Sequence, residues 1–335
     1  MCTSLIVKSR QGPVFARAMQ WNLPEMHWTI VVSSKGHEEV FSLPGTSTVH
    51  QLVNRYSFVG IQTPKADNMI IDGQNEAGLT LSAQYLPYFT QYSQEPTHRN
   101  DLDAISIVDL GKKILGHFSC LSEVEEYLNG CTVWLPQKQF IVPLDVHFII
   151  VDRSGKSLVT EFVDGKVKVY PDSLGVLCNA PNYDWLLTHL RNYLLLTSKF
   201  DETSQNCSFS NLPPLSAGSG TSGMPGSLMS PDRFIRGVFF KNSFPTLNTV
   251  DEAIPHLASM IETFNIPLGS ILTHYEDQVF FETTQFILLK DLVNQCWFVR
   301  LTQDLQYTKI HLETLFQQRG CATYPLSEHY RLVTA

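Results

Sequence analysis

Cys2 combines two groups that could take part in catalysis. Removal of the initiator Met1 would leave Cys2 with a thiol that can act as a nucleophile and a free α-amine that can act as a base. Thiols have a reference pKa of about 8.5 and α-amines of about 7.7–8.0, so both groups can exchange protons near neutral pH. The alternative is that Cys2 is only a small residue in a first strand, and other parts of the sequence must decide between the two.

Four later segments bear on this choice through their residue types and their order along the chain. They are Arg17-Ala18-Met19-Gln20-Trp21, Asp72-Gly73-Gln74-Asn75-Glu76-Ala77-Gly78-Leu79, Leu177-Cys178-Asn179-Ala180-Pro181 and Ser230-Pro231-Asp232-Arg233-Phe234.

The first half of the chain has patterns that are typical of strands. Residues 4–8 and 14–18 flank a turn-rich insert, which predicts a hairpin with Arg17 near Cys2 on the paired strand. A turn is predicted at Gly73, after a strand over 68–72. The other strands predicted in this half are 28–32, 39–43 and 79–83.

Helix signals follow. Ser122 and Glu125 form a capping box that predicts a helix over 122–128, and Thr249 and Glu252 form another. Ser230 is predicted to cap a helix that has Pro at its first position. An apolar stripe predicts a further helix over 183–196. The remaining strands are predicted at 146–151, 157–162, 166–170, 270–275, 279–283, 286–289 and 296–300.

The order of these elements limits the fold. Strands, helices, strands, helices and strands follow one another without the regular βαβ alternation of a Rossmann fold or an α/β barrel. Two mostly antiparallel sheets with helices packed outside them would fit. Residues 200–230 are rich in Ser, Gly and Pro, and they are either a low-complexity linker or a functional loop beside a site.

Composition disfavours several classes of partner. The chain has 335 residues, 43% hydrophobic, which suffices for one large domain or two small ones. A net charge of −8 without a run of Lys or Arg argues against nucleic acid and anionic membranes. No apolar stretch reaches the ~18 residues of a membrane span. The start of the chain lacks signal-peptide features, so we expect a cytoplasmic protein as written, or a periplasmic or secreted one if a leader was trimmed.

The cysteines and histidines do not suggest a metal site. The seven cysteines are scattered, with no CxxC pair, which also argues against a regular disulfide framework. No HExxH or HxH pattern appears among the eleven histidines.

Taken together, the four segments and Cys2 resemble the choloylglycine hydrolase family of N-terminal nucleophile hydrolases, which includes bile salt hydrolases and penicillin V acylases. The resemblance covers nearly the whole chain. It implies an α+β fold, the αββα four-layer sandwich, formed by residues 2–335 as a single domain with a long loop at 200–230. It also implies an enzyme that hydrolyses linear amides with no metal or cofactor.

The resemblance assigns roles to particular residues. Cys2 matches the nucleophile, and Arg17 matches an arginine that would favour its thiolate. The backbone N–H of Tyr85 and the side chain of Asn179 match the oxyanion donors, with Asn182 as an alternative to Asn179. Arg233 matches an arginine of the family, with a role near the nucleophile or the substrate.

Gln20 departs from the family pattern, in which an Asp orients the N-terminal amine. Glutamine can accept one hydrogen bond from the amine but cannot stabilise an ammonium by charge. We therefore expect either an active enzyme or a catalytically weakened relative that acts as a binding protein.

The aromatic residue at position 85 favours one substrate class. At the position of Tyr85, bile salt hydrolases tend to carry Asn and penicillin V acylases tend to carry Tyr. The resemblance at this position therefore implies a penicillin V acylase-like or acyl-homoserine-lactone acylase-like pocket for an apolar or aromatic acyl group. Hydrolysis of conjugated bile salts is the alternative. The expected partner is a small-molecule amide, and the family resemblance suggests a homotetramer.

Overall fold

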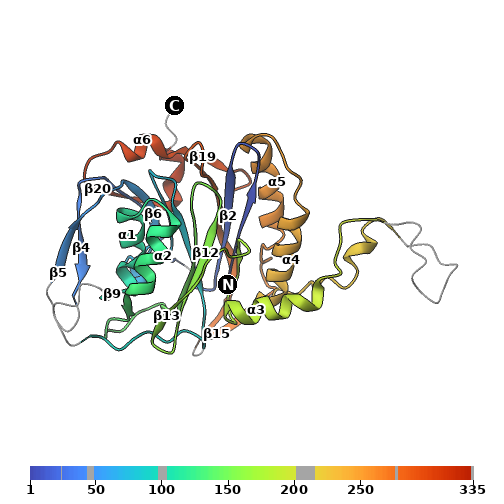
Figure 1. Ribbon diagram of the computed structural model, residues 1–335, viewed down its shortest axis with the longest axis horizontal. Coiled ribbons are helices and arrows are strands. Elements are labelled where there is room, and N and C mark those ends of the chain that lie inside the picture. The colour runs from blue at the N-terminus through green and yellow to red at the C-terminus, as the bar shows by residue number, and fades with distance from the viewer. Residues whose placement is uncertain (24, 44–48, 97–103, 201–215, 276–277, 333–335) are drawn as a thin grey trace.

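Two antiparallel sheets lie face to face in the centre of the molecule, and helices cover the outer face of each (Figure 1). The computed structural model describes residues 1–23, 25–43, 49–96, 104–200, 216–275 and 278–332. The α+β sandwich expected from the sequence is confirmed. The assignment of residues 2–335 to a single domain stays a prediction.

The six-stranded sheet contains the N-terminal hairpin at its centre. Strand β1 pairs with β2 in a register that places Cys2 opposite Met19 and Ser4 opposite Arg17, as the predicted hairpin requires. In spatial order the strands are β14 (Val176–Leu177), β1 (Cys2–Lys8), β2 (Pro13–Trp21), β17 (Thr283–Asp291), β18 (Cys296–Leu301) and β19 (Thr308–His311).

The eight-stranded sheet faces the first one across the middle of the sandwich. All of its neighbouring strands are antiparallel. In spatial order they are β13 (Lys166–Tyr170), β12 (Ser157–Val163), β11 (Val146–Val151), β8 (Thr80–Tyr85), β7 (Asp72–Asn75), β6 (Phe58–Gln62), β3 (Thr29–Ser33) and β20 (Cys321–Pro325).

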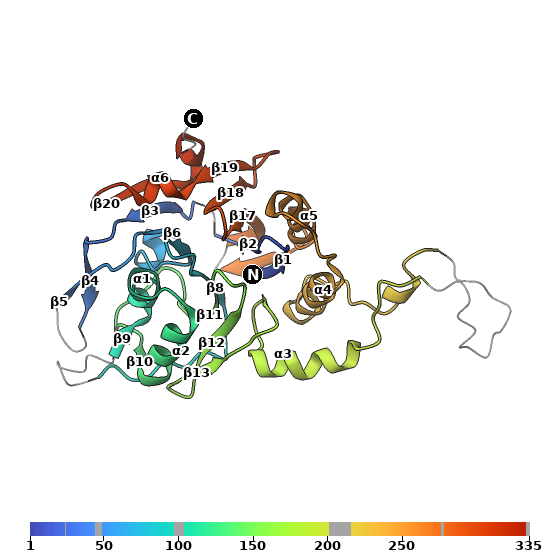
Figure 2. The same cartoon turned by 45° about the horizontal axis from the view of Figure 1, so that its top comes forward.

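Helices form the two outer layers, which the tilted view separates well (Figure 2). Helices α1 (Ile107–His117) and α2 (Leu121–Gly130) cover the eight-stranded sheet, whereas α4 (Ser230–Ser243) and α5 (Val250–Glu262) cover the six-stranded sheet. The remaining helices are α3 (Tyr183–Leu190) and α6 (Leu312–Phe316), with short 3-10 helices at Pro64–Ala66, Arg191–Tyr193, Ser219–Thr221 and Leu326–Leu332. Three two-stranded sheets join β4 (Glu38–Ser42) to β5 (Val49–Val53), β9 (Ala104–Ser106) to β10 (Thr132–Trp134), and β15 (Leu272–Tyr275) to β16 (Gln278–Phe281).

The six-stranded sheet is buried on both faces. Along β17, Phe286 and Leu288 belong to the apolar cluster between the sheets, whereas Ile287 and Leu289 belong to the cluster under α4 and α5. This alternation follows from the two-residue period of a strand. Residues of one strand can therefore face either the space between the sheets or the helices, which matters for β2 below.

Several local predictions are corrected by the structure. Gly73 lies inside strand β7, and the turn falls at 76–78, where Gly78 has a φ of 86°. Ser122 does not cap α2: Cys120 is the N-cap, and Glu123 instead accepts hydrogen bonds from Ser119.

Two further helix predictions differ in outcome. The N-cap of α4 is Met229, so Ser230 is already helical. The hydroxyl of Ser230 accepts a hydrogen bond from the backbone N–H of Asn179 and does not cap the helix. The capping box of Thr249 and Glu252 at the start of α5 is confirmed.

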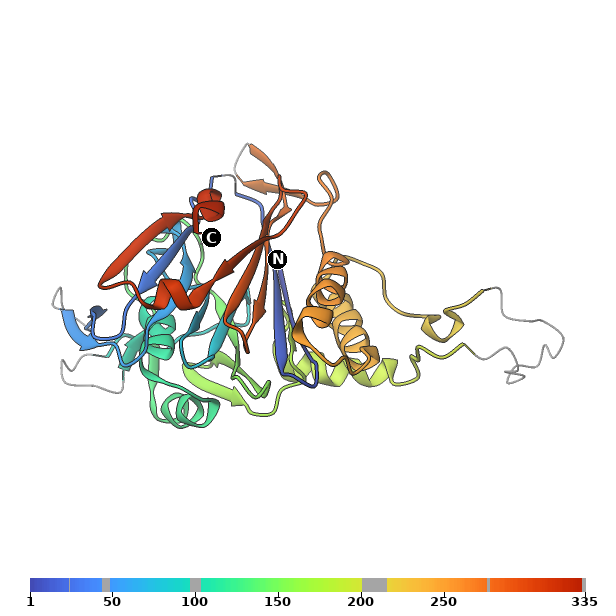
Figure 3. The same cartoon turned by 90° about the horizontal axis from the view of Figure 1, so that it is seen from above.

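The segment after α3 leaves the body of the sandwich. Its described parts, residues 194–200 and 216–222, run away from α3 and α4, as the view from above shows (Figure 3). Of the Ser-rich loop predicted at 200–230, residues 201–215 lie outside the described residues. Among the helices that the structure describes, none is long and apolar enough to cross a membrane.

Candidate active site

Cys2 lies at the start of β1, with its side chain in the apolar space between the sheets. The residue is 1% exposed. Its Sγ lies 3.4 Å from Nη2 of Arg17 and 3.4 Å from Sδ of Met19, both on the adjacent strand β2. The hairpin therefore brings a cation to the sulfur, as the sequence predicted.

The eight-stranded sheet holds Arg17 in this position. Its guanidinium donates to the carbonyl oxygens of Ile71 and Ala83, each at 2.8 Å. It also forms an ion pair at 3.3 Å with Asp72, whose other oxygen pairs with the buried Lys290. Burial lowers the pKa of Lys290 to about 8, against the opposing charge of Asp72. Because breaking a buried ion pair costs about 3–5 kcal/mol, this network fixes the guanidinium firmly.

The surroundings of Cys2 favour its thiolate. Burial raises the pKa of the Cys2 thiol, but the charges of Arg17 and of the N-terminal ammonium lower it more, and the net pKa lies below the ordinary value. Burial raises the pKa of Cys178, which is also fully enclosed, and there the net shift is upward. Of these two buried thiols, only Cys2 is therefore placed to act as a nucleophile.

Asn179 joins the N-terminus to the eight-stranded sheet. Its Oδ1 accepts a hydrogen bond from the backbone N–H of Cys2 at 2.5 Å, and its Nδ2 donates to the carbonyl of Tyr85 at 2.8 Å. Its backbone N–H donates to Oγ of Ser230 at 2.8 Å. The side chain is thus held on both its oxygen and its nitrogen, and a second Nδ2 hydrogen is left for a ligand. The alternative, Asn182, is the N-cap residue of α3.

Arg233 projects from the first turn of α4 onto the same residues. Its guanidinium donates to the carbonyl of Cys2, to Oγ1 of Thr3 at 2.5 Å and to Oδ1 of Asn179 at 2.8 Å. A cation in the first turn of a helix is unfavourable for the helix dipole. Its Nε also donates to the carbonyl of Leu228, just before α4, at 2.9 Å. Arg233 is completely buried, and its other three partners belong to the N-terminal strand and to Asn179, so this arginine links the start of α4 to the N-terminus.

Gln20 faces the helical layer. Its Nε2 donates to the carbonyl of Phe264 at 2.8 Å, while its Oε1 is buried and accepts no hydrogen bond from any residue that the structure describes. The ammonium of Met1 donates to the backbone carbonyl of Gln20 at 2.7 Å and to the carboxylate of Glu282. Gln20 therefore binds the N-terminal ammonium through its backbone carbonyl, and the side chain of the same residue has an oxygen without a hydrogen-bond donor.

An apolar pocket opens beside the sulfur. Its wall includes Met19, Met26 and Met69, as well as Trp28 and Tyr85, whose ring packs edge-on against Trp21 with the centroids 5.3 Å apart. The free space is about 40 Å³. Because methionine side chains repack easily, larger acyl groups can be admitted by their movement.

All six residues predicted from the sequence meet around the N-terminus. Arg17, Asn179 and Arg233 contact Cys2 directly, and Tyr85 contacts Asn179. Gln20 contacts Met1 through its backbone carbonyl only, whereas its side chain binds the carbonyl of Phe264, so its predicted role toward the amine stays a prediction. Sequence reasoning missed four further neighbours, because their roles depend on contacts distant in the chain: Thr3, Asp72, Ser230 and Glu282. The described residues contain no group of three or more His, Cys, Asp or Glu side chains that could hold a metal ion.

The layered fold and an N-terminal cysteine between the two sheets define an N-terminal nucleophile hydrolase. Residues 2–318 match the linear amide C–N hydrolases of the choloylglycine hydrolase family, and the chain belongs to that family. It is an enzyme of the linear amide hydrolase class.

Comparisons with individual proteins agree. The bile salt hydrolase/transferase of Clostridium perfringens is 28% identical over 250 residues, which cover 72% of each chain. The fold matches the crystal structure of the C2A mutant conjugated bile acid hydrolase from Clostridium perfringens, with a TM-score of 0.81 at 23% identity over 97% of this chain and 96% of that one. It also matches penicillin V acylase from Agrobacterium tumefaciens, with a TM-score of 0.73 at 21% identity over 97% and 92% of the two chains.

Proposed function

We propose that Cys2, once Met1 has been removed, hydrolyses a linear amide that carries an apolar or aromatic acyl group. The observation that carries this proposal is the position of the Cys2 sulfur between the Arg17 guanidinium and the wall of an apolar pocket. A cation beside the sulfur favours the nucleophilic thiolate, and an apolar wall favours an acyl group over a charged amine.

The first half of the reaction transfers the acyl group to the enzyme. The α-amine of Cys2 takes the thiol proton, and Sγ forms a bond to the amide carbon. The oxyanion is stabilised by Nδ2 of Asn179 and the backbone N–H of Tyr85. The C–N bond then breaks, the leaving nitrogen takes the proton from the α-ammonium, and an acyl-thioester remains on Cys2.

The second half releases the acid. The α-amine takes a proton from water, whose oxygen attacks the thioester carbon, and the same two donors stabilise the second oxyanion. The C–S bond breaks, the carboxylic acid leaves, and the thiol regains its proton. Every step uses groups of this chain and water alone.

Two residues position the base. Met1 removal frees the nitrogen of Cys2, and we assign the buried, unpartnered Oε1 of Gln20 as an acceptor for this amine. Arg233 fixes the carbonyl of Cys2 and Oδ1 of Asn179 together, and so sets the distance between nucleophile and oxyanion donor. Misplacement of a reacting group by about 1 Å can reduce the rate by about a hundredfold. A buried, hydrogen-bonded arginine that fixes these atoms is therefore valuable for catalysis.

The pocket supports a penicillin V acylase-like or acyl-homoserine-lactone acylase-like substrate. Its aromatic wall of Trp21, Trp28 and Tyr85 suits an aromatic or aliphatic acyl group. Conjugated bile salt hydrolysis is the second candidate, and the 28% identity to a bile salt hydrolase/transferase favours it. A steroid acyl group far exceeds the 40 Å³ of free space, so this substrate requires a larger opening of the pocket.

A substrate panel tests the proposal. Penicillin V, glycine- and taurine-conjugated bile salts and acyl-homoserine lactones are incubated with the purified chain, and amine release is measured. We expect turnover of at least one amide, abolished in Cys2→Ala. Binding of these compounds without Cys2-dependent turnover of any of them would support a catalytically weakened binding homologue instead.

We also propose that the chain forms a homotetramer. The segment that leaves the sandwich carries exposed apolar side chains, among them Leu195 at 95% exposure together with Leu194 and Phe200. Another copy of the chain could cover them. Light scattering coupled to size-exclusion chromatography measures the assembly, and a monomer would contradict it. The compartment in which the enzyme works stays a prediction.

A further inference from the structure

A second pocket lies directly behind the wall of the apolar pocket. This outer groove has a volume of about 550 Å³. One side of it is formed by the start of β17 and the end of β18, and the other side by the start of β3 and the end of β20. Met26 and Trp28 line both pockets. The two spaces are therefore separated by these two side chains.

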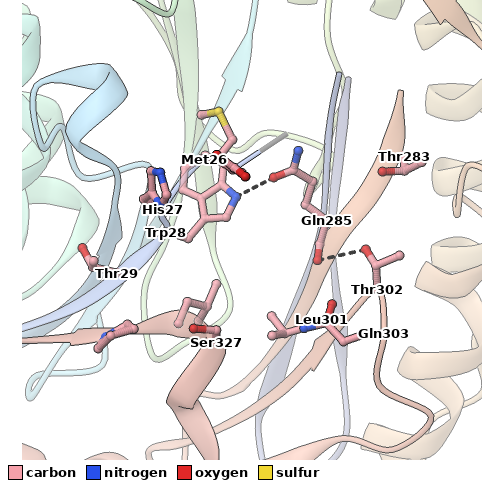
Figure 4. A pocket seen from close by; sticks show the side chains of 13 residues that line it. Met26, His27, Trp28, Thr29, Thr283, Gln285, Leu301, Thr302, Gln303 and Ser327 are labelled. Atoms are coloured by element: carbon pink, nitrogen blue, oxygen red, sulfur yellow. Dashed lines mark hydrogen bonds between the residues drawn. The ribbon is translucent and has the colours of Figure 1, made fainter. Parts of the chain in front are cut away.

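One side-chain hydrogen bond orients the indole ring of Trp28. Nε1 of Trp28 donates to Oε1 of Gln285 at 2.6 Å, and Figure 4 shows the two side chains pointing toward each other across the groove. Gln285 sits at the irregularity in the pairing of β17 with β2, where the register shifts between Thr284 and Phe286. Bulges of this kind redirect a side chain, and they are common beside active sites.

The backbone that carries Met26 and Trp28 is strained. Glu25 and His27, the neighbours of Met26, have φ values of 53° and 51°, in the left-handed region that non-glycine residues seldom adopt. Strain of this kind costs about 1–3 kcal/mol for each residue and is concentrated at functional sites.

The backbone itself is tied to its neighbours, because the carbonyl of Met26 accepts a hydrogen bond from Oγ1 of Thr63 and that of Trp28 accepts one from the backbone N–H of Leu326. The indole of Trp28 has one hydrogen bond, to Gln285, so the ring can rotate while this backbone stays in place.

The groove differs in character from the pocket at the sulfur. Its floor includes the buried apolar residues Met26, Leu301 and Leu326, whereas its rim carries exposed hydrogen-bonding groups such as Gln303 and Ser327. Glu25 also lines the groove, and its carboxylate disfavours an anionic ligand. An acyl group that occupied both spaces would therefore be apolar near its carbonyl and would end in a polar group without negative charge, such as a hydroxyl or an amide.

We propose that the outer groove is the distal part of the acyl-binding site, and that Trp28, latched by Gln285, selects acyl length. With the latch closed, only a short acyl group fits at Cys2. Rotation of Trp28 joins the two spaces and admits a long acyl group with a polar end. This inference rests on the proposed function, because it assumes that Cys2 carries the acyl group.

The test uses activated esters, which report acylation without requiring the natural amide. The p-nitrophenyl esters of butanoate and of 12-hydroxydodecanoate are mixed with the full chain. Nitrophenol release is followed, and acylation of Cys2 is confirmed by peptide mass. The measured quantity is the ratio of the two acylation rate constants, long to short.

Three variants separate the latch from the groove. Trp28→Phe keeps an aromatic ring against Phe286 but has no N–H to hold Gln285, and it should raise the ratio about fivefold, as expected for loss of one net hydrogen bond. Ser327→Trp fills the rim of the groove and should lower the ratio at least about tenfold through exclusion of the long chain. Ser122→Trp, which adds the same bulk at an exposed position of α2 outside both pockets, is the control and should leave the ratio unchanged.

The outcomes distinguish this inference from the proposed function. If the butanoyl ester acylates Cys2 and Ser327→Trp leaves the ratio unchanged, the groove is not the distal site, whatever Trp28→Phe does. If Ser327→Trp lowers the ratio and Trp28→Phe does not raise it, the latch is overturned. If neither ester acylates Cys2 in the unaltered chain, the proposed nucleophile itself is wrong.

Discussion

Nη2 of Arg17 lies 3.4 Å from Sγ of Cys2, within a hydrophobic space that would otherwise disfavour a thiolate. The guanidinium is fixed by two carbonyl oxygens and Asp72 of the facing sheet. The reactivity of the sulfur therefore depends on the packing of one sheet against the other.

Replacement of Arg17 by Met should make Cys2 less reactive at neutral pH. Without the guanidinium the pKa of the thiol rises, so the thiolate fraction at pH 7 falls, by about tenfold for each unit of increase in that pKa. The rate of iodoacetamide alkylation of Cys2, read by peptide mass from pH 5 to 10, measures the shift. The exposed Arg10→Met is the control, and an unshifted profile in a folded Arg17→Met variant would refute the role of this cation.

Replacement of Asn179 by Ala should lower kcat by about a hundred- to a thousandfold, as loss of one oxyanion donor does elsewhere. KM should change little if Nδ2 acts mainly in the transition state. Asn179→Asp is the matched variant, because it keeps an acceptor for the Cys2 nitrogen and for Arg233 but has no Nδ2. It should be as slow as Asn179→Ala, and recovery of activity in Asn179→Asp would assign this residue to positioning alone.

Replacement of Gln20 by Asp should raise kcat/KM on the true substrate. A carboxylate would hold the α-amine with charge assistance and raise its pKa, so the acidic limb of the pH profile should move upward. The variant should also be less stable, by about 1–3 kcal/mol, because the carbonyl of Phe264 loses its donor. Activity is measured per folded molecule across pH, and stability by urea denaturation.

A matched variant separates charge from length at this position. Gln20→Asn has the length of Asp without its charge, so it should share none of the upward shift of the acidic limb. If a well-folded Gln20→Asp enzyme is slower than the unaltered one at every pH, the site has been rebuilt around glutamine.

His117 should make the fold sensitive to acid. Burial, and then the charge of Lys113, lower the pKa of His117 to about 4, whereas the unfolded chain has a value near 6.5. Between these values the unfolded state binds the proton first, so the free energy of unfolding falls as pH drops from about 6.5 to about 4, by about 2–3 kcal/mol. His117→Phe should remove this part of the pH dependence, and the exposed His256→Gln should keep it. Denaturant titrations at pH 4.5 and 7 measure both.

Local signals were enough to place the nucleophile beside its cation. The hairpin needs only a turn-rich insert between two strands, and its register follows directly. The capping box at Thr249 and Glu252 is equally local and was predicted correctly. At Ser122 the same pattern misled, because capping depends on where the chain enters the helix, and Cys120 marks that point.

Contacts between distant segments could not be read in this way. Helix α1 was not predicted, and it contains Gly111 and Gly116, which lower helix propensity. Gly111 is nonetheless required, because a Cβ there would lie 2.9 Å from Cβ of Ile70, in the segment that leads into β7. Likewise Arg233 donates a hydrogen bond to Thr3, which is 230 residues away in the chain. No local sequence pattern predicts that contact.

The most direct test of the account is the mass of the enzyme during turnover. The chain is quenched in acid while it hydrolyses a slow linear amide, and intact and peptide masses are recorded. We predict a protein that lacks Met1 and carries one acyl group as a thioester on Cys2, and we predict that Cys2→Ala carries none and releases no amine. Full turnover by protein that retains Met1, or by the Cys2→Ala variant, would contradict the account.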